Sequence, residues 1–258
     1  MSRIPRSHPR YRSLVLRAHM ADEMRRGIIV PEGLIAHGRG EAFDYLLGEK
    51  TQPFAAAAER AAAAHLLLAK CPVISVNGNV AALATDEVAA IAKALPSIRV
   101  EVNLFHRTPW RAEMVAKRLN EAGVEEVLGV HPTARLRGLP SDRGWVDVRG
   151  ILAADTVLVP LEDGDRAQAL ERAGKFVIAI DLNPLSRTAR AASLPIIDEL
   201  RRALVCVRKE LTYLKPRRAM WKEIAEATDG PGFRLQALEF MAKRLRQLAR
   251  DAPQGPPR

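Results

Sequence analysis

Asparagine side chains follow several short apolar runs of the sequence, at places where a ligand could be bound. The chain has five asparagines, and four of them come at or just after the end of such a run: Asn77, Asn79, Asn103 and Asn183. An asparagine amide can hydrogen-bond a ligand, but asparagine is also a frequent turn former and helix cap. We therefore expect a ligand role for the group, with a plain turn as the alternative at each single position.

Acidic side chains gather after one further apolar run. Glu162, Asp163 and Asp165, followed by Arg166, are the densest acidic group in the main body of the sequence. Carboxylates this close together can hold Mg²⁺ beside phosphates or accept a proton from an attacking amine. The structural alternative is that Asp163 caps the next helix and Asp165 lies at the positive end of its dipole. Asp163 and Asp165 are thus candidate catalytic residues, with Mg²⁺ as a candidate ion beside them.

The sequence has no known phosphate-binding motif, so we consider whether backbone N–H groups at the start of a helix could bind a phosphate. The turn Asn77-Gly78-Asn79 precedes a predicted helix whose free N–H groups suit a phosphate, and a capping turn is the alternative. The sequence has no GxxxxGK[ST] motif, and the stretch His37-Gly-Arg-Gly40 lacks the third glycine of GxGxxG. The candidate substrate-binding residues are Asn77, Gly78, Asn79, Asn103 and Arg166.

Arginines are the other means of binding phosphate. A guanidinium group can bind a phosphate through two parallel hydrogen bonds, and Arg17, Arg39 and Arg187 are available for this. A single arginine is more often a surface residue, so residue type alone does not select these three. For His8 and His37 we favour a surface or capping role in the same way.

These candidates need a scaffold, and apolar runs that alternate with helical patterns provide one. Runs that are nearly continuous in apolar residues are typical of strands buried on both faces, and their alternation with helices indicates a parallel sheet. We predict an α/β fold with a Rossmann-like parallel sheet flanked by helices, whose ligands bind beyond the carboxyl ends of the strands. The predicted strands are Val73–Val76, Val100–Leu104, Val127–Val130, Thr156–Pro160, Phe176–Ile180 and Pro195–Ile197, and the helices between them are Ala81–Leu95, Trp110–Ala122, Asp165–Ala173 and Ser186–Ala191.

Helices are also predicted on both sides of the sheet region. The chain divides into an N-terminal helical region (1–70) packed on the core, a nucleotide-binding core (71–200), basic C-terminal helices (201–250) and a frayed tail (251–258). In the first region we expect a helix capped by Ser7, with Pro9 in its first turn, to about Arg26, and a loop from Pro31 to Gly40. The other predicted helices are Glu41–Leu47, Ala55–Lys70, Glu199–Leu214, Arg218–Ala227 and Phe233–Ala249, with Asp229–Gly232 as a break before the last.

The composition is that of a globular protein whose basic charge is concentrated near the C-terminus. Apolar residues make up 48% and charged residues 27% of the chain. Residues 201–258 hold 14 Lys and Arg against 6 Asp and Glu, whereas residues 1–200 hold 26 against 24. A basic segment can bind nucleic acid, but a solvated helix face is the simpler explanation, so we do not expect nucleic acid as a partner.

Cysteine content and hydropathy bear on the compartment. Cys71 and Cys206 are the only cysteines and lie far apart in the sequence. No apolar run is long enough for a membrane helix, and the first ten residues lack the apolar segment of a signal peptide. We therefore expect no contact with a membrane and a cytoplasmic location, because a reducing compartment fits so few cysteines.

Five longer blocks carry a resemblance to a known family: Ile4–Arg10, Gly33–Tyr45, Val73–Leu83, Val157–Arg166 and Val177–Arg190. Together they resemble archaeal 4-phosphopantoate–β-alanine ligase, or phosphopantothenate synthetase. The resemblance implies a homodimer with a Rossmann-like core. It also implies a ligase of coenzyme A biosynthesis that condenses 4-phosphopantoate and β-alanine to 4′-phosphopantothenate. ATP would be a substrate, released as AMP and diphosphate, with an acyl-adenylate as the intermediate and Mg²⁺ expected beside ATP.

The same resemblance implies which residues contact ATP. They are Arg17, Arg39, Asp181, Leu182, Asn183, Arg187, Thr188, Glu199 and Leu200. Relatives have Asn and Ile where this chain has Glu199 and Leu200, so a backbone contact would be kept there and a side-chain contact would not. Two other functions stay open at this point. The first is a kinase or dehydrogenase on the same scaffold, and the absence of both glycine fingerprints from this sequence argues against it. The second is a nucleic-acid binder, and the low content of aromatic residues (5%), on which bases could stack, argues against that function.

Overall fold

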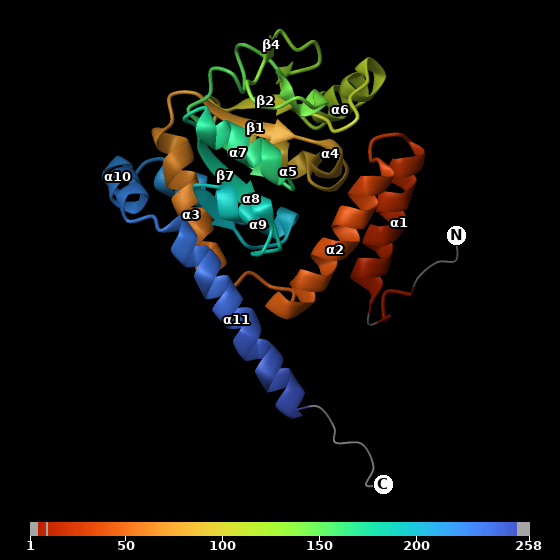
Figure 1. Cartoon of the computed structure of the whole chain (residues 1–258), viewed down its shortest axis with the longest axis vertical. Helices are drawn as coiled ribbons and strands as arrows, with labels where there is room; N and C mark the ends of the chain where they lie inside the picture. Colours follow the sequence, from red (N-terminus) through yellow and green to blue (C-terminus); the bar gives the residue numbers. More distant parts are fainter. Residues whose placement is uncertain (1–4, 9, 252–258) are drawn as a thin grey trace.

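A parallel sheet of six strands forms the centre of the molecule. The computed structural model describes residues 5–8 and 10–251. The strands are β1 (Pro72–Val76), β2 (Arg99–Val102), β3 (Val127–Leu128), β6 (Thr156–Pro160), β7 (Phe176–Ile180) and β8 (Leu194–Ile196). They lie in the order β3-β2-β1-β6-β7-β8, all parallel (Figure 1). Numbered within the sheet alone, this is the 3-2-1-4-5-6 order of doubly wound folds. The predicted α/β class is confirmed, and each predicted strand has its counterpart.

Alternate residues of the central strands belong to two hydrophobic cores, one on each face of the sheet. Ile74 and Leu158 belong to the first core, and Val73 and Val157 to the second. This alternation is what burial of both faces requires of a strand. The helices with residues in the first core include α3 (Pro53–Leu68), α5 (Thr85–Ala94), α6 (Pro109–Glu121) and α9 (Leu200–Leu214), and α7 (Gly164–Arg172) contributes to the second.

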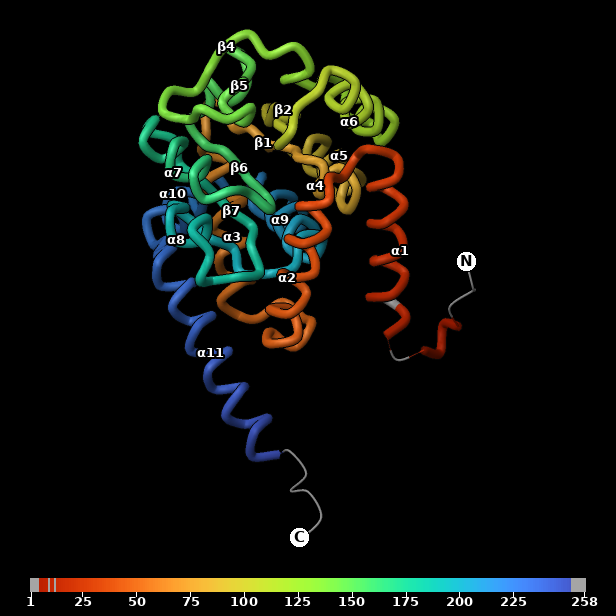
Figure 2. The backbone as a smooth tube through the Cα atoms, turned by 45° about the vertical axis from the view of Figure 1, so that its right-hand side comes forward, coloured from red at the N-terminus to blue at the C-terminus, as the bar shows by residue number. Residues whose placement is uncertain are grey.

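Two N-terminal helices, α1 (Tyr11–Arg25) and α2 (Pro31–Leu47), form a hairpin that stands beside the sheet (Figures 1 and 2). The prediction of a loop from Pro31 to Gly40 is wrong, because α2 begins at Pro31 itself. Proline is well tolerated at the first position of a helix. Gly33 suits its place as well, since a Cβ there would collide with the side chain of Asn79.

The start of α1 also differs from the prediction. The helix begins at Tyr11, with Arg10 as its N-cap residue, so Ser7 does not cap it. The predicted place of Pro9 in the first turn lies outside the described residues. His8 has a local role, because its Nδ1 accepts a hydrogen bond from the Arg10 backbone N–H at 3.0 Å.

The C-terminal helices agree with the predicted pattern. After α9 come α10 (Arg218–Glu226) and α11 (Gly230–Asp251), and the far half of α11 extends away from the body of the molecule (Figure 2). Residues 227–229 separate the last two helices, and the predicted break Asp229–Gly232 is wrong for its last three residues, because α11 begins at Gly230 rather than Phe233. The Oδ1 atom of Asp229 accepts the N–H of Gly232 in the first turn of α11 at 2.9 Å. Apart from Asp251, the predicted frayed tail lies outside the described residues. None of the helices that the structure describes has both the length and the apolar character needed to cross a bilayer.

Two further features of the core were not predicted. The expected helix Ala81–Leu95 is divided into α4 (Gly78–Leu83) and α5, with Ala84 between them in a non-helical conformation. A small antiparallel hairpin of β4 (Ala134–Arg135) and β5 (Trp145–Val146) lies between β3 and β6 in sequence, with a short 3₁₀ helix, η1 (Asp142–Gly144), in its connection. The last short helix beside the sheet is α8 (Arg187–Ala191).

Candidate functional site

A cleft of about 1160 Å³ opens at the carboxyl ends of the strands. One side is formed by α1 and α2, and the other by the segments that follow β1, β6, β7 and β8. The order of the sheet reverses between β1 and β6, and doubly wound sheets bind their ligands at such a point. The cleft is therefore the candidate functional site.

The predicted site residues divide into those that line this cleft and those that do not. The lining residues are Arg39, Asn77, Gly78, Asn79, Asp163, Asp181, Leu182, Asn183, Glu199 and Leu200. The predicted residues that do not line it are Arg17, Asn103, Asp165, Arg166, Arg187 and Thr188. The fold thus brings together most of the segments that the sequence singled out.

The amides of Asn77 and Asn79 are bound to the backbone. Asn77 caps α4, since its Oδ1 accepts the N–H of Val80 at 3.1 Å, and its Nδ2 donates to the carbonyl oxygen of Pro160 at 3.0 Å. Asn79 Nδ2 donates to the carbonyl oxygen of Gly33 at 2.9 Å. The first asparagine joins the end of β1 to the end of β6, and the second attaches α2 to α4. Both amides therefore hold the walls of the cleft in place.

Asn103 and Asn183 also bind backbone groups. Asn103 lies just after β2, and its Nδ2 donates to the carbonyl oxygens of Arg143 (3.1 Å) and Trp145 (3.0 Å). The side chain of Asn183 shapes the turn after β7, because its Oδ1 accepts the N–H of Leu185 at 2.8 Å. The turn or cap alternative thus describes Asn77 and Asn183, whereas the amides of Asn79 and Asn103 bind carbonyl groups of distant segments.

Charged side chains form a buried cluster at the end of β6. Glu162 contacts two arginines, with its Oε1 2.6 Å from Arg143 Nη1 and its Oε2 bound by Arg166. Arg166 is fully buried, and it also donates to Ser75 Oγ at 3.1 Å. Burial without water lowers the pKa of Arg166. The acidic group predicted from the sequence is therefore partly structural, because Glu162 is committed to the arginines.

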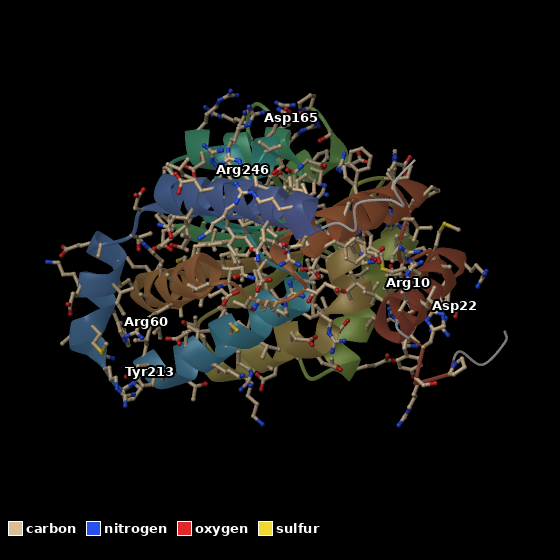
Figure 3. The ribbon with its side chains drawn as sticks, turned by 90° about the horizontal axis from the view of Figure 1, so that it is seen from below. Arg10, Asp22, Arg60, Asp165, Tyr213 and Arg246 are labelled. Carbon is tan, nitrogen blue, oxygen red and sulfur yellow. The ribbon has the colours of Figure 1, made fainter. Side chains whose placement is uncertain are left out.

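Asp163 and Asp165 have different surroundings. Asp163 lines the cleft with about half of its side chain exposed (53%), and its partial burial raises its pKa. Asp165 lies outside the cleft and is ion-paired with Arg187 at 2.5 Å, and Figure 3 shows it at the outer edge of the molecule. Among the described residues no group of three or more His, Cys, Asp or Glu could hold a metal ion. The two aspartates therefore lie in different surroundings, and only Asp163 lines the cleft.

The segments after β7 and β8 form the other end of the cleft. Asp181 Oδ1 accepts the N–H of Asn183 at 2.9 Å, and burial raises the pKa of Asp181. Glu199 caps α9 by accepting the N–H groups of Arg201 (3.1 Å) and Arg202 (3.0 Å), and burial raises its pKa as well. The Glu199 side chain thus serves as the N-cap of its own helix.

Helices α1 and α2, which form the helical wall of the cleft, carry several polar side chains that contact one another. Arg17 is ion-paired with Glu41 at 2.7 Å, and the hydroxyl of Tyr45 donates to the same carboxylate at 2.6 Å. His37 lines the cleft nearby, and burial lowers its pKa, which keeps the imidazole neutral near pH 7. Arg39 is exposed on the same helix and lines the cleft. Arg39 is therefore free to approach an anionic ligand.

Sequence reasoning missed four arginines that line the cleft, and two of them, Arg143 and Arg202, connect its walls. Arg143 lies in η1, and Arg202 on α9 is ion-paired with Asp44 on α2 at 2.6 Å. Neither has a local signal, because each acquires its partners from segments distant in sequence. The position of Arg143 could have been suspected only from Asn103, whose amide holds the Arg143 backbone.

Comparison with known proteins agrees with this architecture. Residues 54–244 match the phosphopantothenate/pantothenate synthetase family. The chain is 55% identical over 204 residues to a 4-phosphopantoate–β-alanine ligase of Thermococcus kodakarensis, which covers 79% of this chain and 78% of the relative. It is 52% identical over 245 residues to one of Methanospirillum hungatei, covering 94% of this chain and 98% of the relative. The chain therefore belongs to the phosphopantothenate/pantothenate synthetase family.

Proposed function

We propose that this protein is an ATP-dependent ligase that joins 4-phosphopantoate to β-alanine in coenzyme A biosynthesis. The observation that carries the proposal is the 52% identity to a 4-phosphopantoate–β-alanine ligase over 94% of the chain. The cleft supports it, because one large cavity at the switch point can hold a nucleotide and two small substrates together. No feature of the cleft favours a kinase, a dehydrogenase or a nucleic-acid binder over this reaction.

The nucleotide would occupy the end of the cleft formed after β7 and β8. Asp181, Leu182, Asn183, Glu199 and Leu200 line this end, and Arg39 faces it from α2. A guanidinium group is suited to the ATP phosphates, where negative charge develops in the first step.

The other predicted ATP contacts do not line the cleft. Arg17 and Arg187 are each paired with a carboxylate, and the Thr188 hydroxyl donates to the carbonyl oxygen of Glu162 at 2.6 Å. We propose that Arg17 and Arg187 exchange these partners for phosphate when ATP binds. The pair of Arg187 with Asp165 is exposed, and an exposed ion pair costs little to break.

The reaction would run in two steps. The carboxylate of 4-phosphopantoate attacks the α-phosphorus of ATP, the bond to the β-phosphate breaks, and diphosphate leaves. The amine of β-alanine then attacks the acyl carbon of the adenylate, and AMP leaves as the amide forms. The ammonium group of β-alanine must first lose a proton, and we propose that Asp163 accepts it. The raised pKa of Asp163 makes this carboxylate a better base than an ordinary aspartate.

Mg²⁺ would enter this site as part of the ATP substrate. The described residues provide no protein cage for the ion. Mg²⁺ commonly keeps several waters and binds through substrate phosphates with one or two carboxylates.

We also propose a homodimer, as the family resemblance implies. Apolar side chains on α11 are available for it: Leu235 is 54%, Leu245 50% and Leu248 48% exposed. Light scattering on the purified protein should give twice the chain mass of 28.4 kDa. A monomer at all concentrations would exclude the dimer and leave the catalytic proposal unaffected.

The ligase proposal is tested by product formation. The purified protein is incubated with ATP, Mg²⁺, 4-phosphopantoate and β-alanine, and mass spectrometry follows 4′-phosphopantothenate. We expect product only when all substrates are present. A folded protein that forms none would show that the substrates are wrong.

A further inference from the structure

Arg143 is held at the cleft by contacts to the segments that follow β2 and β6. Its backbone carbonyl accepts the amide of Asn103, which follows β2. Its side chain reaches the segment after β6, where Nη1 lies 2.6 Å from Glu162 Oε1 and Nε lies 3.4 Å from Asp163 Oδ2. Arg143 lines the cleft although its side chain is only 6% exposed. A buried arginine at the wall of a cavity has been placed there at considerable cost in solvation.

The hydrogen bonds of this guanidinium group are incomplete. Within the part of the chain that the structure describes, Nε and Nη1 of Arg143 have no hydrogen-bond acceptor in good geometry. Glu162 cannot saturate Arg143, because the same carboxylate binds Arg166 and accepts the N–H of Asp163 at 2.8 Å. Buried donors are normally satisfied, so the guanidinium group of Arg143, which lines the cleft, has hydrogen-bonding capacity left for an acceptor in the cleft.

The charges of this corner are complementary to a zwitterion. Arg143 and Arg166 share Glu162, and Arg143 is also paired with Asp163, so two positive and two negative side chains meet in the wall of the cleft. Asp163 is the most exposed of these four side chains, with 53% of its surface accessible. A carboxylate ligand would match the planar fork of the guanidinium group, and an ammonium group would match Asp163.

We propose that Arg143 and Asp163 form the β-alanine subsite, with Arg143 binding the carboxylate and Asp163 receiving the ammonium group. The inference rests on the proposed ligase function. The subsite lies after β6, and the proposed nucleotide residues begin after β7, its neighbour in the sheet. Neighbouring strands are about 5 Å apart, so an amine held at Asp163 adjoins the place where the adenylate would form.

The variants Arg143→Gln and Arg143→Lys test this assignment. Arg135→Gln is the matched control, because Arg135 lies in the same hairpin, on β4, and does not line the cleft. We expect the KM for β-alanine to rise about 10- to 100-fold in Arg143→Gln, as fits loss of charge-assisted hydrogen bonds, and less in Arg143→Lys. The release of diphosphate from ATP and 4-phosphopantoate, without β-alanine, should stay within about twofold of wild type.

A nucleophile without a carboxylate separates binding from support of the fold. Hydroxylamine can attack the adenylate but offers nothing to Arg143, so Arg143→Gln and wild type should form hydroxamate at equal rates. Equal loss with hydroxylamine and β-alanine, or an unchanged KM for β-alanine, would overturn the proposal. Loss of diphosphate release would place Arg143 in the first step instead. A wild-type protein without turnover would refute the ligase proposal, which is a different result.

Discussion

Arg202 on α9 and Asp44 on α2 are joined by two hydrogen bonds, with Nη2 2.6 Å from Oδ1 and Nη1 3.1 Å from Oδ2. Arg202 also contacts Asp198, which follows β8, at 2.7 Å. The pair thus connects the helical wall of the cleft to the end of the sheet where we place the nucleotide. It is partly buried, with 27% of the Arg202 and 14% of the Asp44 side chain exposed.

Asp44→Asn should reduce the free energy of unfolding by about 1.5–3 kcal/mol, because it weakens a bidentate, partly buried charged contact. Urea unfolding measures this directly. Glu226→Gln is the control, since the pair of Glu226 with Lys222 is largely exposed and should contribute less than about 1 kcal/mol. Equal effects of both substitutions would show that the Arg202 pair does not stabilise the helical wall.

Arg39→Ala should lower the rate of adenylate formation more than about 30-fold, because loss of one preorganised charge partner costs about 2–4 kcal/mol. Diphosphate release from ATP and 4-phosphopantoate, without β-alanine, isolates this step. Arg190→Ala is a suitable control, since Arg190 is exposed on α8 and does not line the cleft. Diphosphate release at the wild-type rate in Arg39→Ala would remove Arg39 from the mechanism.

Asp163→Asn should slow amide formation about 100-fold or more, as expected for loss of a general base, while diphosphate release continues. Asp165→Asn is the neighbouring control and should keep near wild-type rates, because Asp165 is paired with Arg187 outside the cleft. Rapid-quench measurements resolve the two steps. The assignment of the base would be wrong if the Asp165 variant alone slowed the second step.

Glu59 makes the stability of the protein dependent on pH. It is fully buried, and burial together with the nearby carboxylate of Asp198 raises its pKa to about 9. The folded protein keeps this proton while the unfolded chain loses it near the ordinary value of about 4.3. At a pH between these two pKa values, unfolding therefore releases a proton. The contribution of Glu59 to the free energy of unfolding consequently falls as the pH rises from about 4.3 to about 9.

Glu59→Gln should remove this contribution. The free energy of unfolding of the variant, relative to that of wild type, should increase as the pH rises from about 5 to 9. Urea unfolding at three pH values tests the slope, with Glu239→Gln on the exposed face of α11 as the control. A difference between variant and wild type that is independent of pH would show that Glu59 is ionised in the folded protein.

The sheet could be predicted from the sequence because each strand carries its own signal. Val73–Val76 and Phe176–Ile180 are continuous apolar runs, and burial on both faces requires such runs wherever the strand lies. Helix α2 could not be predicted in full, because Gly33 and Gly40 are residues typical of loops. Gly33 is required by Asn79, which lies in a distant segment, and tertiary contact overrides the weak local propensity.

The site was predictable where it follows a strand and not where it depends on contacts between segments. Asp181 and Asn183 come directly after β7, so the end of the strand locates them at the cleft. Asp163 and Asp165 are equivalent in sequence, and only the pairing of Asp165 with Arg187 distinguishes them. Arg143 was missed for the same reason, since its place depends on Asn103 and Glu162.

The nucleotide product is the most direct test of the proposed reaction. Purified protein is incubated with ATP, Mg²⁺, 4-phosphopantoate and β-alanine, and chromatography identifies the nucleotides formed. We expect AMP, and only when 4-phosphopantoate is present, because adenylation of its carboxylate precedes attack by the amine. Formation of ADP in place of AMP would contradict the adenylate route and require an acyl-phosphate intermediate.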